Sequence, residues 1–209
     1  MSQPERDLLL GEVRDLSQRF KAGGSAAFDA FSQLVSRLLS LTIAAPYPGL
    51  ALFAGASETR VLSGRRGIGD PIPFAERGYL RLIMTLSLVP GEGRTFLKVM
   101  DSSYQYQLDE RGDRWVFRYD YRRLPADPYP AAHLQVRGRL EDDCLPPGRP
   151  LSRLHFPSGR VSLEGVIRLL ADQFQIPCAR RQELWWPVLA ESERLFYEIA
   201  HSPLSGPTQ

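Results

Sequence analysis

Hydrophobic positions recur every three or four residues near the start of the chain. Over residues 5–21, and again over about 25–41, they fall on one face of a helix. Gly23 breaks the first helix, and Ser25 is placed to cap the second. Neither helix carries enough charge to stand alone. The pattern therefore predicts a helical hairpin over residues 1–45 that packs against another layer.

Between residues 46 and 160 the spacing of the hydrophobic positions changes to two, which is typical of strands. The clearest run begins at Tyr79, where apolar residues occupy every second position through Leu88. Turn residues separate the runs, so we expect an antiparallel β-meander of five to seven strands. The strands of this prediction are residues 49–54, 79–88, 95–101, 103–108, 115–122 and 132–140, with one further strand at about 59–62 within a loop. Residues 152–156 are expected to be extended.

Helical spacing returns over residues 161–201. Ser162 is placed to cap a helix that runs to about Phe174, and a last helix over about 180–201 is expected to kink or start near Pro187. Residues 202–209 are expected to be a disordered tail. We predict a single α+β domain over 1–209, with the N-terminal helical hairpin and the C-terminal helices packed on one face of the sheet.

Composition is ordinary for a globular protein, with 43% hydrophobic and 24% charged residues. No apolar run approaches the roughly 18–20 residues that span a bilayer, and the charged start MSQPERDLLL does not resemble a secretory signal. We therefore expect a cytoplasmic protein without a membrane segment. Two cysteines, Cys144 and Cys178, are too few for a disulfide scaffold or the usual zinc cage. We expect free thiols, no metal and no cofactor.

Arginine supplies almost all of the positive charge, since Lys21 and Lys98 are the only lysines among 26 basic residues. The guanidinium group suits phosphate and carboxylate recognition. The formal net charge is only +2, however, so no whole-molecule field that attracts nucleic acid is expected. Any effect of the arginines must come from a local patch.

The strongest polar constellation lies on two consecutive strands, 115–122 and 132–140. Period-two alternation puts one set of polar residues of each strand on a common face, and neighbouring strands lie about 4.8 Å apart. Histidine can act as a general acid or base, and arginine can hold a phosphate. The alternative is a solvated face of Arg–Asp pairs. The residues are Arg118, Asp120, Arg122, His133, Gln135 and Arg137.

A second candidate is the strand-to-helix junction that follows His155. Ser158 and Arg160 lie near the expected helix N-terminus, where backbone N–H groups could bind an anion. A turn followed by a helix cap is the alternative. Tyr119, one of several tyrosines on these strands, could stack on a nucleic-acid base, although aromatic residues at this spacing commonly pack in a core.

Residues 104–174 resemble the core of TumE-type toxins of bacterial toxin–antitoxin systems. Those proteins share a Tyr/Arg hairpin, an R-[YW]-D strand, a proline loop, a histidine-bearing strand and a closing "SLE-V" helix. The resemblance implies an RNA-directed, toxin-like ancestry with an antitoxin-like protein partner. The matching pieces here are Arg118-Tyr119-Asp120, the prolines between Pro125 and Pro130, Ala132-His133-Leu134-Gln135-Val136 and Ser162-Leu163-Glu164-Gly165-Val166.

Two functions from different classes follow from these features. A macromolecular binding or interaction protein is favoured, because no Ser–His–Asp series or G-x-S-x-G motif is present. The alternative is a metal-independent, RNA-directed, toxin-like ribonuclease that uses His133, Arg118 and His155. RNA or an antitoxin-like protein is the expected partner in both cases, and the sequence indicates no oligomeric state.

Overall fold

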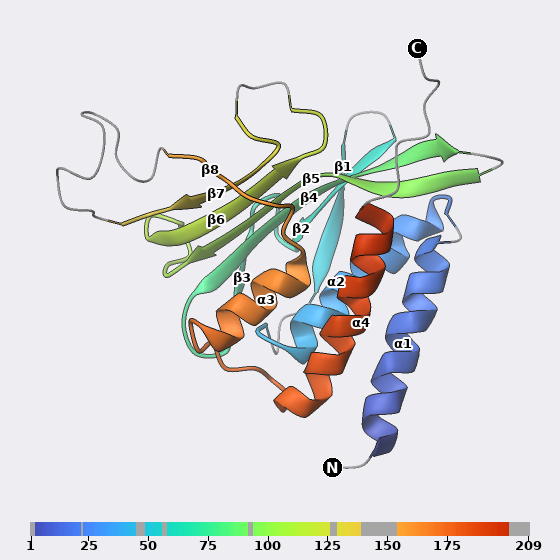
Figure 1. Cartoon of the computed structure of the whole chain (residues 1–209), viewed down its shortest axis with the longest axis horizontal. Coiled ribbons are helices and arrows are strands. Elements are labelled where there is room, and N and C mark those ends of the chain that lie inside the picture. Colours follow the sequence, from blue (N-terminus) through green and yellow to red (C-terminus); the bar gives the residue numbers. More distant parts are fainter. Residues whose placement is uncertain are drawn as a thin grey trace.

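The computed structural model describes residues 3–21, 23–44, 49–55, 58–91, 94–125, 129–138 and 154–200. In this part of the chain four helices pack on an eight-stranded sheet (Figure 1). The helices are α1 (Gln3–Lys21), α2 (Ala26–Leu41), α3 (Leu163–Asp172) and α4 (Gln182–Ala200). The strands are β1 (Leu50–Ala54), β2 (Thr59–Gly64), β3 (Pro71–Pro73), β4 (Tyr79–Gly91), β5 (Arg94–Gln107), β6 (Trp115–Arg122), β7 (Ala132–Val136) and β8 (Phe156–Pro157).

All strand pairs are antiparallel, and the order across the sheet is β1-β2-β4-β5-β6-β7-β8. The short β3 also pairs with β4, where Ile72 lies opposite Leu80. Neighbours in the sheet are therefore neighbours in the chain apart from this short addition. The α+β meander expected from the sequence is confirmed, with one more strand than the upper limit of the prediction.

The helices cover one face of the sheet and, within the described ranges, leave the other face open (Figure 1). In β4 the covered face carries Leu80, Leu82, Met84 and Leu86, which are at most 2% exposed. The residues between them are exposed or half-buried. The period-two alternation therefore separates a helix-covered face from an open face, as antiparallel sheets commonly do.

The helices that cover the sheet come from both ends of the chain. Helices α1 and α2 form the expected hairpin, and α1 also contacts α4 (Figure 1). Val13 of α1 and Leu38 of α2 are at most 1% exposed and belong to the same core cluster as the sheet residues. Burial of this apolar stripe, rather than helix propensity, holds the hairpin in place.

Several details differ from the sequence-based expectations. Ser25 has helical backbone angles and forms no side-chain capping bond, so the predicted cap of α2 is wrong. The segment expected as two strands is the single strand β5, because Ser102 continues its pairing with both neighbours. Helix α4 runs through Pro187. The expected tail at 202–209 and Cys144 lie outside the described residues.

The faces of β4 give a direct test of the fold. Leu82→Ala removes a fully buried side chain and should lower the free energy of unfolding by about 2–5 kcal/mol. Ile83→Ala changes a half-buried residue on the open face and should cost less than half as much. Chemical denaturation of both variants measures the difference. Equal losses would contradict the assignment of the two faces.

Candidate functional site

Two rows of polar side chains cross the open face of the sheet. In one row Ser103 of β5 lies opposite Asp120 of β6, which lies opposite His133 of β7. In the other row Arg118 of β6 lies opposite Gln135 of β7. The rows are two residues apart along each strand, so their side chains point to the same face. Strand pairing alone therefore assembles the predicted constellation.

Arg118 connects the two rows. Its Nε donates a hydrogen bond of 2.7 Å to Asp120 Oδ2, and its Nη2 donates to Gln135 Oε1. Because the Gln135 oxygen accepts from Arg118, the Gln135 amide nitrogen faces His155, 3.1 Å from its Nε2. The amide N–H group is the donor in that contact. A single guanidinium group thus fixes the orientation of an amide that in turn contacts an imidazole ring.

His155 is held as a neutral ring by these contacts. Its Nε2 accepts from Gln135, so the proton of the neutral form lies on Nδ1, which is buried and has no hydrogen-bond partner in the described part of the chain. Burial, followed by the charges of His133 and Arg118, lowers the pKa of His155, while Asp120 acts in the opposite direction. The ring also stacks on Tyr129, with a centroid distance of 4.0 Å and an interplanar angle of 14°.

The second imidazole of the site, His133, is 4.5 Å from His155 between ring centroids. His133 Nδ1 lies 3.0 Å from the carbonyl oxygen of Pro130 and donates to it. His133 Nε2 lies 3.6 Å from Asp120 Oδ2, beyond hydrogen-bond length but within ion-pair range when the ring is charged. His133 is therefore the ring of the pair that a carboxylate can stabilise as an imidazolium.

Arg118, Asp120, Tyr129, His133 and His155 line a cleft with a volume of about 640 Å³ on the open face. That volume is within the range of about 300–1,000 Å³ typical of ligand sites. Asp101, Arg122 and Leu124 also line the cleft, as does Thr85, where a β-bulge shifts the pairing of β4 with β5. Bulges often re-aim side chains next to functional sites.

The structure brings together five of the residues proposed from the sequence. Arg122 also lines the cleft at its rim, with an exposed side chain. Arg137 is exposed at the end of β7, where it donates to the carbonyl oxygen of Asp113, and it does not line the cleft. The five residues in mutual contact are Arg118, Asp120, His133, Gln135 and His155.

Three other proposed residues lie elsewhere. Tyr119 packs edge-to-face on Phe117 at 5.6 Å, on the covered face of the sheet. Ser158 bonds through its backbone N–H to the carbonyl oxygen of Ala132. Arg160 lies among the helices on the covered face, where it lines a different cavity. None of these three belongs to the cleft.

The anion site expected at the start of α3 is already filled by the protein. Ser162 accepts the N–H of Gly165 at 2.9 Å, so its predicted capping role is confirmed. The Ser162 hydroxyl donates to Glu193 Oε1 at 2.9 Å, and Glu193 also pairs with Arg168. A carboxylate of α4 therefore occupies the position in which an anion was expected.

Sequence reasoning overlooked the walls that come from β4 and β5. Ile83, Asp101 and Ser103 share the open face with Arg118 because β5 lies between β4 and β6. The signal was present, since these residues occupy the polar or half-buried positions of alternating strands. What was missing was the register that sets Asp101 opposite Arg122.

Comparisons of the chain with protein-family models, with curated proteins and with solved structures gave no significant match. Within the described ranges, no group of three or more His, Cys, Asp or Glu residues is arranged to hold a metal ion. No helix in this part of the chain has the length and apolar character needed to cross a membrane. The cleft itself is therefore the feature of the structure that bears most directly on function.

The lowered pKa of His155 makes stability depend on pH. An unfolded histidine takes up a proton near pH 6.5, whereas folded His155 does so only at lower pH. The contribution of His155 to the free energy of unfolding is therefore fully present above about pH 6.5. It is lost as the pH falls toward the pKa of His155 in the folded protein. Denaturation between pH 7.5 and 5 should show a steeper loss for the wild type than for His155→Gln. Parallel profiles would contradict the assignment.

Proposed function

We propose that this protein binds single-stranded RNA in the cleft on the open face of its sheet. The observation that carries the proposal is the stacked pair of Tyr129 and His155 beside Arg118 and Arg122. Single-strand binders combine aromatic rings that stack on bases with cationic groups that follow the phosphates. Both elements line the same cleft.

Tyr129 provides the aromatic ring on which a base would stack. Its ring is stacked on His155, yet the residue is 50% exposed, so the ring can be reached from solvent. Asp120 neutralises part of the charge of Arg118, and Asp101 adds a second carboxylate. We therefore expect stacking to dominate over charge, with a modest dependence on salt.

The hydrogen-bond network favours binding over catalysis. His155 Nε2 and His133 Nδ1 both contact protein groups, and His155 Nδ1 is buried. Such a network orders the side chains that it joins at the cleft.

An antitoxin-like protein partner, as the resemblance implies, would compete with RNA if it covered the same surface. A cytoplasmic location is part of the same proposal.

Phosphodiester cleavage is a second candidate, favoured by the 4.5 Å separation of the two imidazole rings at the cleft. His133 Nε2 would take the proton of the ribose 2′-hydroxyl, with Asp120 stabilising the imidazolium. The 2′-oxygen would bond to phosphorus as the bond to the 5′-oxygen breaks, and the His133 imidazolium would give its proton to the leaving oxygen, with the neutral ring of His155 beside it. Arg118 would stabilise the developing charge on phosphorus.

Binding can be tested by fluorescence anisotropy with a labelled single-stranded RNA of mixed sequence. Tyr129→Ala should weaken binding by roughly tenfold or more, since loss of one base–aromatic stack costs about 1–3 kcal/mol. Tyr197→Ala is the matched control, because Tyr197 is 43% exposed on α4 and does not line the cleft. Equal affinities of the two variants, or no binding by the wild type, would overturn the proposal.

Cleavage is tested with the same RNA by gel analysis. If the second candidate is correct, His133→Asn lowers the cleavage rate by about 10²–10⁴-fold, the usual contribution of a general acid or base. The products carry 2′,3′-cyclic phosphate ends, and EDTA has no effect. His201→Asn is the histidine control. RNA that is bound but left intact by the wild type would instead reject cleavage and retain the binding proposal.

A further inference from the structure

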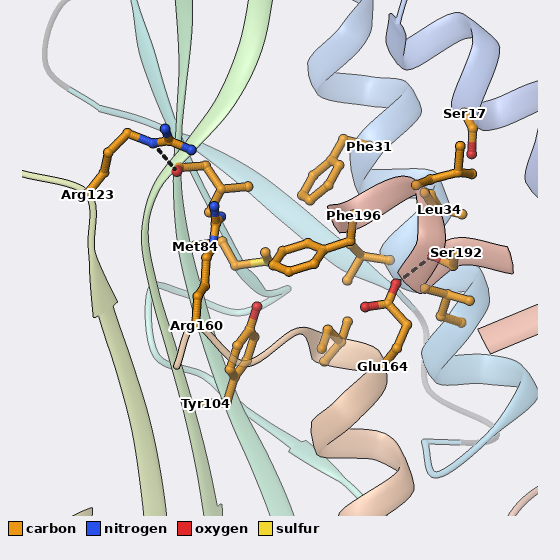
Figure 2. Close-up of a pocket in the computed structure, with 15 residues that line it drawn as sticks. Ser17, Phe31, Leu34, Met84, Tyr104, Arg123, Arg160, Glu164, Ser192 and Phe196 are labelled. Atoms are coloured by element: carbon orange, nitrogen blue, oxygen red, sulfur yellow. Dashed lines mark hydrogen bonds between the residues drawn. The ribbon is translucent and has the colours of Figure 1, made fainter. Parts of the chain in front are cut away.

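A second cavity lies on the covered face of the sheet, between the strands and helices α2, α3 and α4 (Figure 2). Its volume is about 50 Å³. Most of its walls are apolar and come from α2, through Phe31 and Leu34, and from the sheet, through Met84 and Val99. The cavity is separate from the cleft on the open face, since none of the described residues lines both.

Arg160 brings a positive charge into this apolar cavity. The guanidinium group lies over the ring of Tyr121 at 4.2 Å and over the ring of Phe196 at 4.8 Å. These contacts stabilise a cation but accept none of its N–H groups in ordinary hydrogen bonds. Nε and Nη1 of Arg160 are buried and have no hydrogen-bond partner among the described residues. Buried donors without an acceptor are costly and rare in folded proteins.

The surroundings of Arg160 add positive charge instead of compensating it. Arg123 lines the same cavity. Lys98 is only 6% exposed and lies close enough for the charges of both arginines to repel its ammonium group. Burial and the charges of Arg123 and Arg160 lower the pKa of Lys98. In the described ranges none of the three forms an ion pair with a carboxylate. The only carboxylate that lines the cavity in these ranges belongs to Glu164.

Glu164 does not supply the missing negative charge. Figure 2 shows it with Ser192 on the opposite side of the cavity from Arg123 and Arg160, with Phe196 between. Burial raises the pKa of Glu164, which favours its neutral form, and its Oε1 is 2.5 Å from the Ser192 hydroxyl. The cavity thus has a cationic end, apolar walls and a largely neutral far end.

We propose that this cavity binds a short-chain monocarboxylate, with the carboxylate at Arg160 and Arg123 and the alkyl chain between α2 and the sheet. The carboxylate oxygens would accept the N–H groups of Arg160 that have no acceptor. The cavity has room for about four water molecules, at about 10–15 Å³ of its volume each. Propionate or butyrate takes up a similar space. A bare inorganic anion would leave the apolar walls without a partner.

Methionine methyl groups provide a local test. The chain has three methionines, and Met84 lines the cavity whereas Met100 does not. In protein labelled with ¹³C at the methionine methyl groups, sodium propionate should shift the Met84 signal saturably and leave Met100 in place. Met84→Leu assigns the signal. Propanamide, which has the same shape without charge, should bind at least tenfold more weakly to the wild type.

Variants then separate the charge from the shape of the cavity. Arg160→Gln should reduce propionate affinity at least tenfold, while Arg66→Gln, an exposed arginine outside the cavity, should leave it unchanged.

Across acetate, propionate, butyrate, hexanoate and octanoate, affinity should peak at propionate or butyrate. The proposal is overturned if Met84 does not move, if propanamide or sulfate binds as well as propionate, or if affinity rises steadily to octanoate. The propionate–propanamide comparison needs no variant, so it holds even if Arg160→Gln fails to fold.

Discussion

The pairing of β6 with β7 decides which side chains share the open face. Because side chains alternate along a strand, a slip of one residue would turn His133 and Gln135 toward the helices. The same slip would bring Leu134, which packs against the core, onto the open face. Burial of Phe117 and packing of the partly buried Leu134 on the covered side therefore hold His133 opposite Asp120 and Gln135 opposite Arg118. The geometry of the cleft rests on hydrophobic contacts made on the far side of the sheet.

Within that register, Arg118 sets the chemistry of the open face. Its bond to Asp120 is the Arg–Asp pair that a solvated sheet face would also carry. Its second bond, to Gln135, is different, because Gln135 is buried and contacts His155, which directly precedes the neighbouring strand β8. The face is thus neither a set of independent surface pairs nor a set of free catalytic groups. It is a connected network whose half-exposed members line a cleft.

The sequence predicted well those features that arise from local periodicity. The alternation in β4 and β6, the Ser162 cap and the two faces of β6 all follow from neighbouring residues. Contacts made over long distances in the chain were not predictable in this way. The approach of His155 to Gln135 depends on a connection of about twenty residues between β7 and β8. The burial of Arg160 depends on how α4 packs, which no local pattern encodes.

The short segment from His155 to Ser162 belongs to both faces of the molecule. His155 lines the cleft on the open face, Phe156 and Pro157 pair with β7 at the edge of the sheet, and Arg160 lines the cavity under the helices. The chain thus passes around the sheet edge within a few residues before Ser162 begins α3. Because β8 pairs with β7 over only two residues, few ladder bonds hold this passage in place. The side chains at its two ends therefore anchor it: His155 through Gln135 and Tyr129, and Arg160 through Tyr121 and Phe196.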